Sequence, residues 1–178
     1  LAANYRVFGR STVSGYFLDR EEFGNRGEIL KKQFSRNAGI ELSFTSSDGK
    51  WSGWLTHHRS FKPGISKENW WGNFGGQYRV RGFSWLTDLL HMGENYYADL
   101  GFERRIENFD LVRDTTVRIG YKFWYNEFSY QVFPKSKGGR LNFAEFGGEI
   151  FHVFNPNGSF NESSNTLFAS LNFKNTSE

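Results

Sequence analysis

Long segments of the chain alternate apolar and polar residues with a period of two, and this alternation restricts the possible folds more than any other feature. Between residues 40 and 45, polar side chains separate Ile40, Leu42 and Phe44. Successive side chains of a β-strand point to opposite faces, so this order describes a strand with one apolar and one polar face. The same alternation recurs in three further segments, at 74–87, 116–125 and 166–174. The chain is therefore predicted to be all-β.

The alternation, together with the turn residues between its segments, predicts eight strands: 5–18, 36–46, 50–61, 71–87, 114–125, 128–133, 141–154 and 166–174. Asp48-Gly49 and Asn157-Gly158 mark the clearest turns, because Gly and Asn accept a positive φ angle. Neighbouring strands are therefore expected to pair as antiparallel hairpins. Residues 28–33 are the one segment compatible with a short helix, and no linker divides the chain, so residues 1–178 are predicted to form a single domain.

The predicted strands are long and carry aromatic residues near their ends. Several exceed the about 5 to 6 residues usual in soluble sheets and reach the about 9 to 11 residues of a tilted strand that crosses a membrane. Aromatic pairs near strand ends, as at the two interfaces of outer-membrane barrels, are Trp51 and Trp54, Trp70 and Trp71, and Tyr96 and Tyr97. These features predict an antiparallel up-and-down transmembrane β-barrel in the outer membrane of a Gram-negative bacterium, or a consecutive run of strands from a larger barrel. Residues 175–178 are polar and include no terminal aromatic residue of the kind bacterial barrels usually have, which favours a run of strands from a larger barrel.

The alternation also assigns side chains to the two faces of such a barrel. The residues predicted to face lipid are Tyr78, Val80, Val117, Ile119, Tyr121 and Phe123. The residues predicted to face the lumen are Arg79, Arg81, Arg118, Lys122 and Trp124. A charge on the lipid side costs roughly 2 to 4 kcal/mol at the midplane, so the basic residues predict a positive inner wall that favours anionic solutes, or sugars stacked on Trp124. The alternative is that they only pair with acidic residues such as Glu41 and Glu149.

The sequence offers no candidate for catalysis, cofactor binding or metal binding. It contains no cysteine, which excludes disulfides, thiolate metal sites and a cysteine nucleophile. His57 and His58 are adjacent on a strand and point to opposite faces, while Glu145 and Glu149 lie about 13 Å apart, too far for paired glycosidase acids. The formal net charge of only +3, without a run of basic residues, argues against nucleic acid as a partner.

Two glycine pairs lie inside predicted strands, Gly75-Gly76 and Gly147-Gly148. A phosphate-binding loop would need a following helix and a Lys-Ser or Lys-Thr pair, which are missing from the sequence after both. The glycines are instead expected to mark bends, bulges, or sites where a neighbouring aromatic ring lies over bare backbone in a curved sheet.

Residues 93–105 resemble a signature of an outer-membrane β-barrel family of Bacteroidetes, in which a carbohydrate-binding domain similar to family nine precedes a large barrel. The matching residues are Tyr97, Asp99, Leu100, Gly101, Phe102 and Arg105. Ala98 and Arg104 stand where that family commonly has proline. The resemblance covers only the barrel portion, implies that Gly101-Phe102 ends a loop entering the next strand, and supplies no catalytic residue. Because the family's barrel is much longer, it implies that this chain is part of one.

These observations predict a non-enzymatic barrel that passes or handles a solute at the cell envelope, with carbohydrate or glycan as the solute through the resemblance alone. The expected partners are the lipid bilayer, that solute and other envelope proteins. Two other functions fit the same pattern. One is a soluble β-barrel or sandwich that binds a ligand, and the other is a structural barrel subunit of an envelope or secretion complex.

Overall fold

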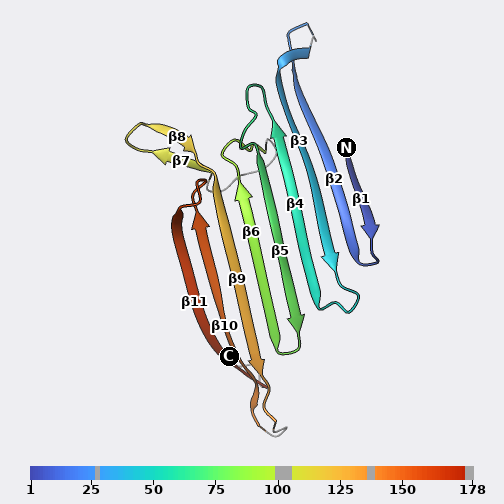
Figure 1. The fold of residues 1–178 in the computed structure, drawn as a ribbon, viewed down its shortest axis with the longest axis vertical. Coiled ribbons are helices and arrows are strands. Elements are labelled where there is room, and N and C mark those ends of the chain that lie inside the picture. Colours follow the sequence, from blue (N-terminus) through green and yellow to red (C-terminus); the bar gives the residue numbers. More distant parts are fainter. Residues whose placement is uncertain (27–28, 99–105, 136–138, 175–178) are drawn as a thin grey trace.

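The computed structural model of the chain describes residues 1–26, 29–98, 106–135 and 139–174. Nine strands form one antiparallel sheet in the order β1 (Ala2–Val7), β2 (Ser11–Phe23), β3 (Ile29–Thr45), β4 (Trp51–Phe61), β5 (Trp70–Val80), β6 (Phe83–Met92), β9 (Tyr121–Val132), β10 (Leu141–Phe154) and β11 (Phe160–Phe173). A separate hairpin, β7 (Glu107–Asp110) and β8 (Thr115–Arg118), follows β6 and precedes β9 in the chain. Figure 1 shows this meander, with the hairpin projecting from one end.

The all-β antiparallel class is confirmed, and the sheet is not closed, because β1 and β11 form its two edges without pairing to each other. The described residues contain no helix, hence none long and apolar enough to cross a membrane. The short helix allowed at 28–33 is not formed, since β3 already begins at Ile29.

Three predicted strands are each two strands in the structure. A turn at residues 8–10 divides 5–18, and the turn Arg81-Gly82 divides 71–87, with Gly82 at a φ angle of 83°. Neither turn contains the Asn or Pro that would announce it, so alternation alone could not reveal them. The predicted strand 114–125 is interrupted between Arg118 and Tyr121, and its second part continues without a break through 128–132 as β9.

The two ends of the sheet differ mainly in one connection, residues 93–120 between β6 and β9, which is far longer than any other (Figure 1). The short-turn end holds residues 8–10, 46–50, 81–82 and 133–140, and the long-loop end holds residues 24–28, 62–69, 93–120 and 155–159. The turn at 46–50 is well ordered by Asp48, which accepts hydrogen bonds from Ser46 Oγ at 2.7 Å and from the Lys50 amide at 3.1 Å. These hydrogen bonds, with that from the Lys50 side chain, hold the pKa of the Asp48 carboxyl well below its usual value.

One face of the sheet, called the apolar face, is covered by large hydrophobic side chains. A row of direct cross-strand partners runs across it through Val13, Leu42, Leu55, Phe74, Leu89 and Trp124. Leu55, Phe74 and Leu89 are 47%, 57% and 45% exposed. Among the described side chains, the charged groups on this face lie toward the long-loop end: Asp19, Glu21, Arg36, Arg59 and Lys122.

Aromatic rings border the apolar face at both ends. At the short-turn end Trp51 packs on Tyr78 with ring centroids 4.5 Å apart, and Tyr78 lies 6.2 Å from Phe83. At the long-loop end Trp70 stacks on His91 at 4.1 Å. On β4 the two borders are Trp51 and Phe61, whose ten residue steps correspond to about 33 Å along the strand.

The strands are offset along their length in one consistent direction. Trp51 is the first residue of β4, and a row of cross-strand partners connects it to Leu167 of β11. β4 begins at this row, whereas β11 extends beyond it by six residues, to Phe173, which is about 20 Å. Divided over the five strand pairs between β4 and β11, this offset is about 4 Å per pair. With neighbouring strands about 4.8 Å apart, it corresponds to a strand tilt of about 40° from the axis of a barrel. The tilt reduces the 33 Å between the aromatic borders to a height of about 25 Å, which is the height of the apolar band of outer-membrane barrels.

The sheet has no second layer over most of its area. Its accessible surface of 12717 Å² compares with about 8,900 Å² expected for a compact monomer of 20.7 kDa. Among the described residues the buried hydrophobic side chains are Met92, Tyr96, Ile106 and Val153, all at the long-loop end. The hydrophobic residues of the apolar face therefore do not form a core within this chain.

Two of the glycines accommodate aromatic rings, as expected from the sequence. A Cβ on Gly75 would lie 2.3 Å from Cζ2 of Trp54, its cross-strand partner, and a Cβ on Gly147 would lie 2.3 Å from Cζ of Phe168. Both pairs lie on the face opposite the apolar one, where small residues under large rings allow a sheet to curve.

Replacing Gly75 with Ala is expected to lower the free energy of unfolding by about 1 to 3 kcal/mol, because the new methyl group displaces the Trp54 ring. The matched control is Gly76→Ala, where the nearest atom to the added Cβ is Ser52 O at 3.4 Å. Urea midpoints followed by tryptophan fluorescence in detergent micelles measure both. Equal midpoints for the two variants would contradict this packing.

Candidate functional site

The second face of the sheet, called the polar face, is lined mainly by hydroxyl, amide and carboxylate side chains. One row of partners runs through Ser52, Gln77, Leu86, Glu127, Glu149 and Thr166. Neighbouring side chains bond to one another across strands: Trp54 Nε1 and Asn73 Nδ2 donate to Asp88 Oδ1 at 3.1 and 2.7 Å. These contacts fix the side chains of the polar face in a hydrogen-bonded layer.

The connection between β6 and β9 folds over the long-loop end of the polar face with its described parts, residues 93–98 and 106–120. Its Tyr96 and Ile106 are 2% and 0% exposed and pack on Met92 of β6. Trp71, Leu90 and Tyr121 complete this cluster from the sheet. The apolar residues at this end of the polar face are therefore explained by the connection that covers them.

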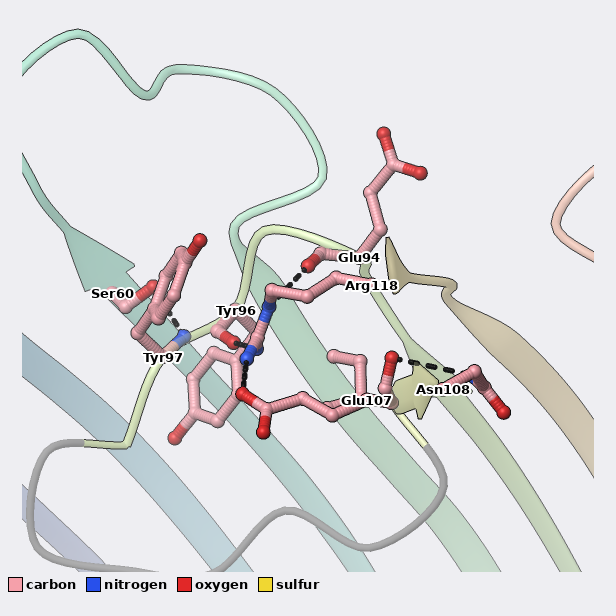
Figure 2. A network of polar contacts seen from close by, with 8 residues as sticks. Ser60, Glu94, Tyr96, Tyr97, Glu107, Asn108 and Arg118 are labelled. Carbon is pink, nitrogen blue, oxygen red and sulfur yellow. Dashed lines mark hydrogen bonds and ion pairs between the residues drawn. The ribbon is translucent and has the colours of Figure 1, made fainter. Parts of the chain in front are cut away.

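Arg118, the last residue of β8, holds the connection together (Figure 2). Its guanidinium donates to the carbonyl oxygen of Glu94 at 3.1 Å, to that of Tyr96 at 2.5 Å and to Glu107 Oε1 at 2.5 Å. The guanidinium carbon also lies 4.1 Å from the centre of the Tyr97 ring. The Arg118 side chain therefore holds together the two described parts of the connection, residues 93–98 and 106–118.

Two polar side chains of the sheet anchor the same connection. Ser60 Oγ of β4 accepts a hydrogen bond from the Tyr97 amide at 3.1 Å, and Asn37 Nδ2 of β3 donates to the Tyr97 carbonyl oxygen at 2.8 Å. Ser60 and Asn37 are cross-strand partners and are 1% and 7% exposed. The connection therefore extends sideways over the polar face from β6 to β3.

Carboxylates dominate the charges of the polar face. The acidic side chains are Glu41, Asp88, Glu127, Glu145, Glu149 and Glu162, against Arg6, Arg20 and Arg79. Neutral groups supply hydrogen bonds to several of them: Tyr125 Oη donates to Glu127 at 2.9 Å, and Gln131 Nε2 donates to Glu145 at 3.3 Å. Glu127 and Glu149 are direct cross-strand partners. The face is therefore a negatively charged wall.

The five residues predicted to face the lumen do not share a face. Only Arg79 lies on the polar face, as a partner of Ser84. Lys122 and Trp124 lie on the apolar face, Arg81 is in a turn with its guanidinium 4.9 Å from the Phe133 ring centre, and Arg118 is in the β6–β9 connection. Lys122 and Trp124 were assigned to the lumen because Tyr121 and Phe123, on the other face of β9, were taken to face lipid.

The six residues predicted to face lipid are also divided. Tyr78 and Val80 lie on the apolar face, whereas Tyr121 and Phe123 lie on the polar face as partners of Met92 and Leu90. The other two are Val117, which is in the β7–β8 hairpin, and Ile119, which lies between β8 and β9 and whose amide donates to the Ile106 carbonyl oxygen. Tyr121 and Phe123 are apolar because they lie at the covered end of the polar face.

Of the family-like motif only Tyr97 can be placed, since Asp99, Leu100, Gly101, Phe102 and Arg105 lie outside the described residues. Sequence reasoning did not identify Ser60, Asn37, Tyr96 or Ile106 as part of a site. The one signal was the tyrosine pair Tyr96-Tyr97 in a segment without alternation, which was interpreted as an interfacial aromatic pair, with Tyr97 also assigned to the family-like motif.

The described side chains include no group of three His, Asp or Glu residues placed to hold a metal ion. No protein-family model, curated protein or solved structure matches the chain. The function has to be argued from the two faces of the sheet and from the connection that covers one of them.

Replacing Arg118 with Ala removes three hydrogen bonds from the connection and is expected to speed hydrogen exchange at the amides of residues 94–97 roughly 10- to 100-fold. The control is Arg113→Ala at the exposed tip of the β7–β8 hairpin, whose ion pair to Asp110 spans 3.6 Å. Mass spectrometry of exchanged peptides distinguishes the two. Unchanged protection of 94–97 in the Arg118 variant would show that Arg118 does not hold the connection.

Proposed function

We propose that this sheet is part of the wall of a transmembrane β-barrel in a Gram-negative outer membrane, and that its polar face lines a path for a small polar or cationic solute. The observation that carries the proposal is the apolar face, whose described charges all lie toward its long-loop end, so that on β4 it carries no charge from Trp51 to His57. The function requires no catalytic step.

The exposed apolar face needs an apolar surrounding. Fully burying a Leu or Phe side chain contributes about 1.5 to 3 kcal/mol, and side chains such as Leu55, Phe74 and Leu167 obtain little of this within the chain. A soluble sandwich would satisfy them with a second sheet, but the described residues supply none. Lipid supplies the same environment on a single-layer wall, and the tilted strands and aromatic borders fit its thickness.

The unequal connections give the proposed wall a direction. Outer-membrane barrels have short turns on the periplasmic side and longer loops outside. The short-turn end would therefore face the periplasm, and the β6–β9 connection would begin at the external end and fold inward over the lumen. Such a connection narrows the path, because it occupies space above Trp71, Leu90 and Tyr121.

The charges of the polar face set the expected selectivity. A wall that carries Glu127, Glu149 and Asp88 attracts cations and repels anions, opposite to the preference expected from the sequence. Hydroxyl and amide side chains such as Thr166 and Gln77 add hydrogen-bonding groups for neutral polar solutes, including sugars. Glycans therefore remain compatible with the proposal through the family resemblance.

Leu55→Arg and Thr56→Arg form a matched pair, since the two residues are adjacent on β4 and point to opposite faces. Leu55→Arg places a charge against lipid at a cost of about 2 to 4 kcal/mol, so the fraction of protein assembled in the membrane should fall steeply. Thr56→Arg, beside Glu41, should assemble nearly as the parent does. Urea-resistant membrane fractions quantify both, and equal assembly would refute the lipid-facing assignment.

The negative wall can be tested with a single cysteine, because the chain has none of its own. In Thr166→Cys, the thiol lies opposite Glu149 and near Glu127, so a cationic thiosulfonate should react several-fold faster than an anionic one. Adding Glu127→Gln and Glu149→Gln should bring the two rates together. A faster reaction with the anionic reagent would contradict the proposed selectivity.

A further inference from the structure

The two edges of the sheet leave backbone groups without partners. Among the described residues no strand lies beyond β11 along its 14 residues. At the other edge β1 pairs with residues 11–16 of β2, and the Leu1 amino group donates to the Phe17 carbonyl oxygen. Beyond Phe17, β2 has no described strand on that side up to Phe23. In hydrocarbon each unpaired N–H or C=O group costs several kcal/mol, so both edges require partners if the sheet spans a membrane as proposed.

Direct pairing of β1 with β11 cannot continue the antiparallel pattern. β1 runs toward the turn at 8–10 and β11 runs from the loop at 155–159 toward the short-turn end, so both point the same way. This follows from the odd number of strands, nine, in a strictly alternating sheet. β1 is also short, with 6 residues against 14 in β11, and would leave most of that edge open.

A second copy of the chain does not solve the problem. Two copies inserted in the same direction would bring β11 of one beside β1 of the other, and these strands are again parallel. Antiparallel pairing of two β11 edges would require one copy to be upside down in the membrane. The asymmetry between short turns and long loops argues against such an arrangement.

We infer that the gap between β11 and β1 is filled by an odd number of further antiparallel strands from the same polypeptide, outside residues 1–178. The strand beside β11 runs from the short-turn end to the long-loop end and continues the apolar face beyond Leu167 and Leu171. A strand of the same polypeptide is favoured over a separate protein, because a linked segment pairs without the entropy cost of association. This inference rests on the proposed function, since lipid makes the open edges costly.

Photo-crosslinking from the β11 edge tests the inference in the native membrane. With p-benzoylphenylalanine in place of Ser170, whose partner on β10 is Glu145, two cross-links are expected: one to β10, and one to a segment of the same polypeptide outside residues 1–178. The matched control is the same replacement of Gln77 in the interior strand β5, which should link only to β4 and β6.

The possible products separate the alternatives. A link from position 170 to β1 within one chain, to a second copy, or to a different protein would overturn the inference while leaving the membrane wall intact. If position 170 did not cross-link to β10, or position 77 did not cross-link to β4 and β6, the strand order of the sheet would be wrong and the inference would fail with it. Lipid exposure is measured separately by the Leu55 and Thr56 variants, so failure of the proposed function can be recognised independently.

Discussion

A single-layer sheet with one apolar face, whose described charges lie only toward the long-loop end, must find an apolar environment outside itself, and this constraint explains most of the structure. The apolar face is continuous from Val13 to Leu167, yet nothing in the described chain covers it. The consistent strand offset and the aromatic rings at both ends bring its height to about 25 Å. Glycines under the rings of Trp54 and Phe168 permit curvature toward the other face. Together these features fit the proposed membrane wall.

The polar face shows how one connection changes the meaning of local sequence. At the long-loop end Tyr96 and Ile106 cover it, and the sheet residues beneath are apolar. Toward the short-turn end the connection does not cover the polar face, and the side chains there are hydroxyl, amide and carboxylate groups instead of apolar ones. Arg118 joins the two described parts of this connection, because its three hydrogen bonds go to Glu94, Tyr96 and Glu107. The same connection supplies the only compact apolar cluster among the described residues, and it would narrow a path along the negative wall.

The fold class and much of the strand layout could be predicted from the sequence, because they depend on local alternation. The bounds of β10, Leu141–Phe154, were predicted correctly, and neighbouring strands pair as antiparallel hairpins. Face assignment was less predictable. Tyr121 and Phe123 alternate as lipid-facing residues do, but they lie beneath a connection whose path no local pattern encodes. Lys122 looked like a lumen residue, although it lies near the long-loop border of the apolar face, where its Nζ donates to the Pro156 carbonyl oxygen. The turn at Arg81-Gly82 was missed because two residues suffice to reverse the chain.

The central claim is that the apolar face meets lipid and the polar face meets water. Spin labels placed one at a time at residues 51–57 of β4, in a chain free of other cysteines, test it directly in lipid vesicles. Collisions with dissolved oxygen should be frequent at 51, 53, 55 and 57, and collisions with a water-soluble nickel chelate frequent at 52, 54 and 56. Uniform accessibility to the nickel chelate along the strand, or the opposite phase, would contradict the account.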